Sequence, residues 1–394
     1  MALQKISTNI IEDNAVDGTK ISVGTPAAGD ILYYDGSKYV ELPKGTDGQE
    51  LIVGTNNLPA WGQGTSGTSP TDGNAWILGG VNAGAGTGDL LYYSFNSDGH
   101  QVVATVTSWG GTSINSPPGI FGTIGVSSST HSWHMGTHIS TTITDITEKF
   151  AFASATDAAN PTTLSHTGDC AGRFFSSSHI GCQSSTAGYC AGGRDFEGVA
   201  RIASSRKVDF SNDNVSTLPG AANMPTTRFG HKCTNNSTHA LYAGGRTSDS
   251  NNNNQSNLTR IDRFTFATET MQGSWDDLST AMEGGSQSAN ETHSFFYGGQ
   301  AAVTGGNPFA TTIERFTFAS QSSQTDHGSL TRQISNDEGA QNTTHGFSVG
   351  GADPNGVSFA DVNAYAFANN TTAAKTADLQ LTVNGGAGCQ PPTV

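Results

Sequence analysis

The stretch RFGHKCTNNSTHALYAGG, residues 228–245, decides the fold of this chain. It holds two short runs with apolar residues on either side of an Asn-Asn-Ser-Thr segment, and it ends in a glycine pair. Asn, Ser and Thr favour tight turns because their side chains bond to nearby backbone groups. Two short runs separated by such a turn predict a β-hairpin.

The glycine pair recurs along the chain at a nearly constant spacing. Its first residue lies at positions 79, 136, 192, 244, 298 and 350, so successive copies are 57, 56, 52, 54 and 52 residues apart. Five pairs are intact, Gly79–Gly80, Gly192–Gly193, Gly244–Gly245, Gly298–Gly299 and Gly350–Gly351, whereas Gly136 is followed by Thr137. Because the pair ends a strand in every copy, we interpret it as close backbone packing near the centre of a repeat structure and not as a phosphate loop.

A strand with alternating aromatic or apolar residues follows each glycine pair. Its copies end at Phe95, Phe152, Phe210, Phe266, Phe318 and Phe367. Alternation with a period of two predicts a strand with one buried face. A further strand is expected around Leu164, Leu218, Leu278, Leu330 and Leu379. Four strands in each of six units predict an all-β fold, a six-bladed β-propeller without any helix.

Composition and charge narrow the function. Charged residues make up 13% of the chain, against about 25% in a typical domain, and 18 Lys/Arg against 33 Asp/Glu give a net charge of −15. Residues 1–72 carry 4 basic and 9 acidic residues, and the remainder carries 14 and 24, so neither part is basic. These counts argue against binding to nucleic acid or to an anionic membrane. No signal peptide and no run of about 18 apolar residues is found, so neither secretion nor membrane insertion is predicted.

The cysteines do not indicate a crosslinked or metal-bound fold. There are five, an odd number, and none forms a Cys-x-x-Cys pair. We expect reduced, mostly buried thiols and neither a disulfide framework nor a zinc site. The five are Cys170, Cys182, Cys190, Cys233 and Cys389.

The ends of the chain differ from the repeats. Residues 384–394, NGGAGCQPPTV, match the innermost strand of a blade, so we predict that the C-terminal strand completes the first blade and removes a free sheet edge. Residues 31–42, ILYYDGSKYVEL, predict a hairpin turning at Asp35-Gly36. The predicted organisation is an N-terminal β-hairpin module in residues 1–61, a Gly/Ser/Thr linker in residues 62–72, and the propeller in residues 73–394. No heptad pattern supports a coiled-coil stalk.

Two features carry a resemblance to known families. The glycine pair and the aromatic strand after it resemble the kelch-type blade over residues 73–394, although the tryptophan usual in such blades is convincing only at Trp275. More closely, the combination I-x-x-F-x-F-A-[ST] and S-x-T-H-G-[YF]-x-x-G-G resembles repeats in virion proteins of tailed bacteriophages, especially marine ones. Residues 29–62 resemble the small β modules near the N-termini of phage tail fibres, which connect them to the particle.

The resemblance implies a tail fibre or tail-associated virion protein. It would dock through the N-terminal module and use the propeller to recognise the host surface. The implied partners are other virion proteins, further copies of the chain within the particle, and a glycan or protein of the host surface. The implied location is the virion, after synthesis in the host cytoplasm. Two alternatives stay open for the chain, a decoration or scaffold subunit of the virion and a glycan-degrading propeller enzyme. A loosely packed N-terminal arm is the alternative for the module.

Enzyme motifs are not found in the sequence. It has no GxxxxGK[ST] phosphate loop, no HExxH zinc pair, no GxSxG nucleophile elbow, no EF-hand loop and no sialidase Asp-box. We therefore expect a protein that is not an enzyme and that needs no cofactor and no metal.

Four histidines occupy the same place in their repeats, five residues before the first glycine. Because equivalent positions in different blades lie far apart, we expect these rings to bond the adjacent turn backbone and not to share a metal. The four are His131, His239, His293 and His345. Asp98, Asp195 and Asp353 lie near turns, where capping of the turn is favoured over calcium binding.

The loops after the glycine pairs are the candidate ligand-binding sites. They vary in length between repeats, and in rigid β scaffolds such loops often carry function. Their Asn, Ser and Gly content suits polar, carbohydrate-like surfaces, and solvated turns without a ligand would have the same composition. The candidate contact residues are Arg194, Asp195, Arg246, Asn252, Asn253, Asn254 and Asn307.

Overall fold

The computed structural model divides the chain into two compact units, Met1–Ser69 and Pro70–Val394. The boundary falls inside the predicted linker. The described residues are 27–389 with gaps at 45–48, 54–57, 64–73, 79–80, 83–84, 87–88, 95–98, 106–107, 110–111, 114–119, 122–123, 140–141, 153–164, 170–178, 194–201, 248–255, 302–308, 322–324, 370, 375–378, 380–381 and 383–386. Within these ranges no helix is long and apolar enough to span a membrane.

Two antiparallel hairpins form the described part of the first unit. Strands β1 (Ile31–Tyr34) and β2 (Tyr39–Leu42) pair with each other, as do β3 (Gln49–Val53) and β4 (Pro59–Gln63). The turn between β1 and β2 is longer than the predicted two-residue Asp-Gly turn, because Tyr34 pairs with Tyr39 and leaves four residues in the loop. Asp35 shapes this loop with its side chain, whose Oδ1 accepts the backbone N–H groups of Ser37 at 2.8 Å and Lys38 at 2.9 Å.

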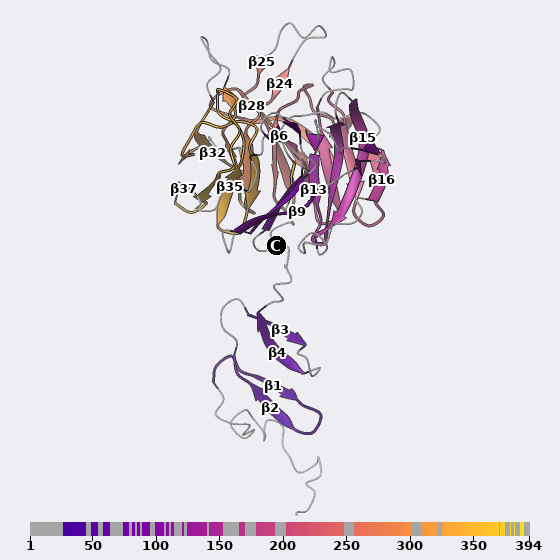
Figure 1. Cartoon of the computed structure of the whole chain (residues 1–394), viewed down its shortest axis with the longest axis vertical. Helices are drawn as coiled ribbons and strands as arrows, with labels where there is room; N and C mark the ends of the chain where they lie inside the picture. Colours follow the sequence, from indigo (N-terminus) through magenta and orange to yellow (C-terminus); the bar gives the residue numbers. More distant parts are fainter. Residues whose placement is uncertain are drawn as a thin grey trace, which may run out of the picture. The chain divides into compact units, whose positions relative to one another are not determined.

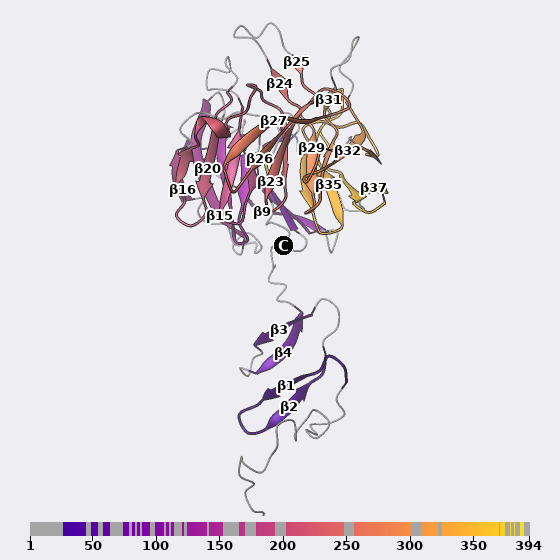
Figure 2. The ribbon, with the colours of Figure 1, turned by 180° about the vertical axis from the view of Figure 1, so that it is seen from behind.

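The second unit is built from antiparallel sheets that stand side by side (Figures 1 and 2). We name each four-stranded sheet, or blade, by its residues. They are the 74–105 blade, β5 (Asn74–Leu78), β8 (Asp89–Ser94) and β9 (Gly99–Thr105) with β38 (Ala387–Cys389); the 182–217 blade, β18 (Cys182–Gln183), β19 (Ala187–Ala191), β20 (Ser205–Asp209) and β21 (Val215–Thr217); the 232–277 blade, β22 (Lys232–Asn235), β23 (His239–Ala243), β26 (Arg260–Thr265) and β27 (Thr270–Asp277); the 286–329 blade, β29 (Ser286–Ala289), β30 (His293–Tyr297), β32 (Thr312–Thr317) and β33 (Thr325–Ser329); and the 338–374 blade, β34 (Glu338–Gln341), β35 (His345–Val349), β36 (Val362–Ala366) and β37 (Thr372–Ala374).

The second unit also contains separate pairs of short strands. They are β6 (Val81–Asn82) with β7 (Ala85–Gly86), β10 (Ser108–Trp109) with β11 (Thr112–Ser113), β24 (Arg246–Thr247) with β25 (Ser256–Asn257), and β28 (Met282–Glu283) with β31 (Gln300–Ala301). The pairs β24–β25 and β28–β31 lie at one end of the propeller, the end where the second strand of each blade finishes (Figures 1 and 2). We call it the loop end, and the opposite end, with the Asn/Ser/Thr turns, the turn end.

Among the described residues there are five regular four-stranded blades and not the predicted six. The segment predicted as the second blade forms a six-stranded sheet of β12 (Ile120–Phe121), β13 (Ile124–Ser127), β14 (His131–Ile139), β15 (Thr142–Ala151), β16 (Ser165–Asp169) and β17 (His179–Ile180). Strand β14 does not stop at Gly136, where the glycine pair is lacking, but passes through a register shift between Met135 and Thr137 and continues to pair with β15 and β12. On the other side, β17 joins β13 in parallel.

The alternating aromatic strand buries its rings, as the period of two predicts. Tyr93, Phe150, Phe264, Phe316 and Tyr365 are each at most 4% exposed. In three sheets this ring makes an edge contact with the aromatic residue two positions further on, for example Phe264 with Phe266 at 5.8 Å between ring centroids. These large buried rings supply much of the apolar area that stabilises the unit.

In four sheets the second aromatic residue at the end of this strand joins the sheet to the one before it. Four such rings stack on the second strand of the preceding sheet at centroid distances of 4.4 to 5.3 Å and interplanar angles below 30°. The pairs are Phe152 on Trp76, Phe210 on Trp133, Phe266 on Tyr189 and Phe367 on Phe295. The sheets are therefore packed by repeated ring stacking, which contributes beyond the buried area alone.

The glycine pairs join the same sheets at the loop end. The second glycine donates its N–H to the backbone carbonyl that leads into the next blade, Gly193 to Arg228, Gly245 to Met282 and Gly299 to Ile334, each at 2.8 Å. The described glycines of these pairs have φ between +62° and +114°, a region that disfavours other residues. Gly79 and Gly80 lie outside the described residues.

The last described strand lies on the first blade. Strand β38 pairs antiparallel with β5, with Ala387 opposite Leu78 and Cys389 opposite Trp76. The sequence predicted that this segment completes the first blade. The pairing covers the inner edge of β5, so that edge is not left open for pairing with another chain.

We predict that Gly299→Ala destabilises the propeller by about 1–3 kcal/mol, because a non-glycine residue at this φ is strained and its Cβ would lie 2.8 Å from the Glu283 carbonyl oxygen. The free energy of unfolding from urea titration measures this. Gly220→Ala is the matched control, since a Cβ at Gly220 meets nothing within 4 Å. Equal stability of the two variants would contradict the role of the glycine pairs in joining neighbouring blades.

Candidate functional site

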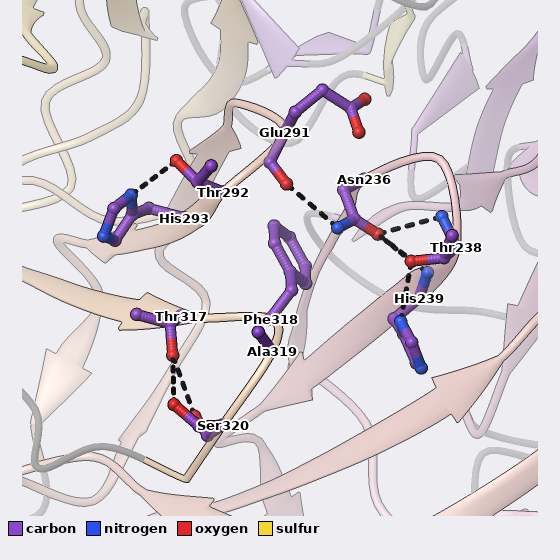
Figure 3. A pocket seen from close by; sticks show the side chains of 10 residues that line it. All are labelled: Asn236, Thr238, His239, Glu291, Thr292, His293, Thr317, Phe318, Ala319 and Ser320. Carbon is purple, nitrogen blue, oxygen red and sulfur yellow. Dashed lines mark hydrogen bonds between the residues drawn. The ribbon is translucent and has the colours of Figure 1, made fainter.

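A hollow of about 370 Å³ opens at the turn end between the 232–277 and 286–329 blades (Figure 3). Two hairpin turns form its walls, and the turn after β32 completes it. Ala319, which is exposed, and Phe318, whose side chain is only 2% exposed, lie between the polar side chains of the two walls. The lining residues are Asn236, Thr238, His239, Glu291, Thr292, His293, Thr317, Phe318, Ala319 and Ser320.

An asparagine organises each wall of the hollow. Oδ1 of Asn236 accepts the N–H of Thr238 at 2.9 Å, the Thr238 hydroxyl at 3.1 Å and the N–H of His239 at 2.8 Å. Asn290 repeats the same three bonds in the next blade. This is why the Asn/Ser/Thr turns recur in the sequence, since one side-chain oxygen holds the whole turn.

The two walls are tied to each other. The Asn236 amide donates to the Glu291 carbonyl oxygen at 3.0 Å, and the Ser237 hydroxyl donates to the Glu291 carboxylate at 2.9 Å. The hollow is therefore held by bonds between neighbouring blades, in addition to the bonds within each turn.

The repeated histidines bond the turn, but through a side chain. Nδ1 of each ring lies 2.7–2.8 Å from the hydroxyl oxygen of the preceding threonine, in the pairs Thr130–His131, Thr238–His239, Thr292–His293 and Thr344–His345. The sequence predicted a bond to the turn backbone. Asn236 and Asn290 already accept the backbone N–H groups of their turns, so the threonine hydroxyl is the partner that remains for the ring.

Burial controls the charge of the two rings in the hollow. It lowers the pKa of His239 and of His293 below the usual 6.5, and the nearby Arg263 and Arg315 lower these pKa values further. Both rings are therefore neutral at pH 7. The Thr238 hydroxyl donates its single proton to Asn236, so Nδ1 of His239 must donate to that hydroxyl and Nε2 must carry a lone pair. The same holds for Thr292 and His293.

The hollow coincides with a change in the ring stacking. Phe318 occupies the same repeat position as Phe266 and Phe367. In the preceding blade, the position that holds their aromatic stacking partner is occupied by Leu241, which belongs to the same apolar cluster as Phe318. Among the described residues Phe318 has no aromatic ring contact. A smaller partner at this one position accompanies the open space beside Phe318. Sequence comparison of the repeats could have found this site, because Leu241 stands where Trp76, Trp133, Tyr189 and Phe295 stand.

Of the candidate contact residues in the loops, the structure describes Arg246. Its guanidinium lies 2.8 Å from Oε1 of Glu283, and its backbone exchanges two hydrogen bonds with Phe229. Arg246 therefore links β24 to the neighbouring blade at the loop end, opposite the hollow. Arg194, Asp195, Asn252, Asn253, Asn254 and Asn307 lie outside the described residues.

The remaining candidate residues for metal binding or acid–base chemistry make contacts that stabilise the fold. Oδ1 of Asp353 accepts the N–H groups of Asn355 and Val357 at 2.8 and 2.9 Å, as a turn cap does. Cys182, Cys190 and Cys233 are buried and are not joined in a disulfide, and the Cys182 sulfur lies 2.9 Å from the Tyr242 hydroxyl. Across the part of the chain that is described, no group of three or more His, Cys, Asp or Glu side chains could hold a metal. Asp98 and Cys170 are not among those residues.

A buried lysine lies between the same two blades, away from the hollow. The Lys232 ammonium donates to the carbonyl oxygens of Tyr297 at 2.6 Å and Gly298 at 3.1 Å. Burial lowers the pKa of Lys232 from 10.5 to about 8, although the charges of Asp337 and Glu314 raise it. Burial raises the pKa of the Asp337 carboxyl from 3.8 to about 6. These groups contact backbone and core, so we assign them to the scaffold.

We predict that Lys232 contributes a rise in stability with pH. Between about pH 8 and 10.5 the unfolded chain keeps a proton that folded Lys232 has lost, so this group adds at most about 3 kcal/mol to the free energy of unfolding across the window. Burial raises the pKa values of the Cys233 thiol and the Tyr242 hydroxyl, which contribute with the opposite sign, so the measured quantity is the difference between variants. In urea titrations at the two ends of the window, Lys232→Met should show a change in stability that is lower than that of the unmodified protein by about this amount. Lys207→Met, a partly exposed lysine paired with Glu269, should show the same change as the unmodified protein. Equal changes in Lys232→Met and the unmodified protein would refute the assignment.

Comparison with known proteins supports the architecture. No protein-family model matches the chain, and no curated protein matches it. Solved structures do match, 306 chains in all. One is the β-propeller protein YjhT, with a TM-score of 0.56 and 10% sequence identity over 78% of this chain and 98% of YjhT. At this identity the likeness shows the fold alone, and the chain contains a β-propeller.

Proposed function

We propose that this chain is a structural protein of a tailed-phage virion, in a tail fibre or associated with the tail. In this proposal the N-terminal unit docks on the particle, and the propeller recognises the host surface without catalysing a reaction. The resemblance of the repeats and of residues 29–62 to phage virion proteins supports it. The organisation into a small β unit and a separate propeller agrees with a division between docking and recognition.

The observation that carries the proposal is an exposed apolar face on the first hairpin. Leu32, Tyr34 and Tyr39 are 43%, 55% and 62% exposed. Tyr34 and Tyr39 are paired across the strands, with ring centroids 5.4 Å apart, and such directly paired residues lie on the same face. Exposed apolar surface on a small unit is typical of a protein–protein interface. Because a unit of this size buries little core of its own, a partner would also stabilise it.

We predict that the double substitution Tyr34→Ser and Tyr39→Ser prevents incorporation into particles. Immunoblots of purified particles assembled with the variant should show the protein reduced at least about tenfold, the size expected when two buried aromatic contacts are lost. The propeller should keep its melting temperature. Val357→Ser, which removes a propeller side chain that is 55% exposed, is the control and should be incorporated normally. Normal incorporation of the tyrosine variant would contradict docking through this face.

Recognition by the propeller is tested with cells. Labelled full-length protein should bind susceptible host cells and not resistant ones. Equal binding to both would overturn host recognition. Imaging of the particle gives a second test, since a propeller buried among other virion proteins would favour the decoration or scaffold role, and turnover of host polysaccharide by the purified protein would favour the glycan-degrading enzyme.

A further inference from the structure

We infer that the hollow between the 232–277 and 286–329 blades binds a neutral saccharide of one or two sugar rings. This inference rests on the proposed recognition role and gives it a site and a ligand class. The site lies at the turn end, whereas Arg246, the described candidate contact residue, lies at the loop end.

The size of the hollow fits such a ligand. Its volume is about 370 Å³, near the lower limit of roughly 300 Å³ for small-molecule sites. Hydrogen bonds hold both walls, so the hollow exists before a ligand arrives. A preformed site avoids the cost of ordering its loops on binding.

The polar groups that line the hollow offer a ligand hydrogen-bond acceptors but few hydrogen-bond donors. The Asn236 amide donates to the Glu291 backbone, and the Thr317 hydroxyl donates to the Ser320 carbonyl at 2.8 Å. Nε2 of His239 and Nε2 of His293 each keep a lone pair, and within the described residues neither has a hydrogen-bond partner. A ligand that satisfies these rings must bring donors, as the hydroxyl groups of a sugar do.

The apolar part of the hollow suits the other face of a sugar. Phe318 lies between the two histidine rings, and Ala319 lies beside it (Figure 3). Pyranose rings carry C–H groups on their faces and hydroxyl groups at their edges. Phe318 is only 2% exposed, so the C–H face would pack over the exposed Ala319, with the Phe318 ring lying under this surface, while the edge hydroxyls reach the histidine nitrogens.

Charges around the hollow disfavour ionic ligands of either sign. The Glu291 carboxylate at the wall opposes an anion. Arg263, whose Nη1 donates to the Phe318 carbonyl oxygen at 3.4 Å, opposes a cation, as does Arg315 near His293. A neutral ligand avoids both penalties.

Saturation-transfer NMR with purified full-length protein tests the inference. The probes are the methyl glycosides of glucose, galactose, mannose and N-acetylglucosamine, with glucuronic acid and glucosamine as the charged comparison. At least one neutral glycoside should bind, and more tightly than either charged sugar. Binding of none of the neutral probes, or tighter binding of a charged one, would overturn the inference.

Variants locate the site. Ala319→Trp, at an exposed position, should fill the hollow and abolish binding. His239→Leu should weaken binding about five- to tenfold, the effect of one lost hydrogen bond, and His239→Gln, which restores an acceptor, should recover part of it. His131→Leu is the matched control, because His131 makes the same threonine bond outside the hollow. Equal weakening by His131→Leu would show that the effect is structural and overturn the assignment.

The same variants separate this inference from the proposed function. If Ala319→Trp abolishes sugar binding and also cell binding, the hollow is the recognition site. If Ala319→Trp keeps full binding to susceptible cells, host recognition stands and the hollow is not its site. If the unmodified protein binds susceptible and resistant cells equally, host recognition fails whatever the sugar result.

Discussion

Each sheet of the propeller is completed by the sheet before it. The aromatic residue that ends the third strand stacks on the second strand of its predecessor, as Phe266 does on Tyr189, and the second glycine bonds the backbone that enters the next sheet. One contact lies at the turn end and the other at the loop end, so where both are present a sheet is held at its two ends by its neighbours. Within the described residues the ring stack occurs four times and the glycine bond three times. A single repeat lacks these contacts, which explains why the chain repeats the unit instead of varying it.

Much of the fold could be predicted because its signals are local in the sequence. The period of two on the aromatic strand and the glycine pairs with positive φ identify strands and their ends from a few residues. The enlarged sheet around β14 could not be predicted, because Gly136 without its partner gives no sign that the strand continues or that β17 pairs in parallel with β13. The four-residue turn at Asp35 also depends on side-chain bonds that the Asp-Gly motif does not specify.

The candidate site was predicted less well, for a physical reason. Loop length and polar composition predicted ligand contacts in the loops after the glycine pairs. Of the predicted contact residues the structure describes Arg246, which lies at the loop end. The hollow arises instead from a difference between repeats, Leu241 in place of an aromatic residue, combined with turns that are nearly identical elsewhere. Because the turn residues are nearly identical in all repeats, a single repeat does not indicate such a site. The site is recognised only when two neighbouring blades are considered together.

The position of β5 has a mechanical consequence. It is the first propeller strand after the N-terminal unit, and it lies inside its sheet between β8 and β38. A force that reaches the propeller from the N-terminal unit would enter it at β5 and load the hydrogen bonds on both sides of this strand. The three residues of β38, which come more than 300 residues later in the sequence, would therefore share that force.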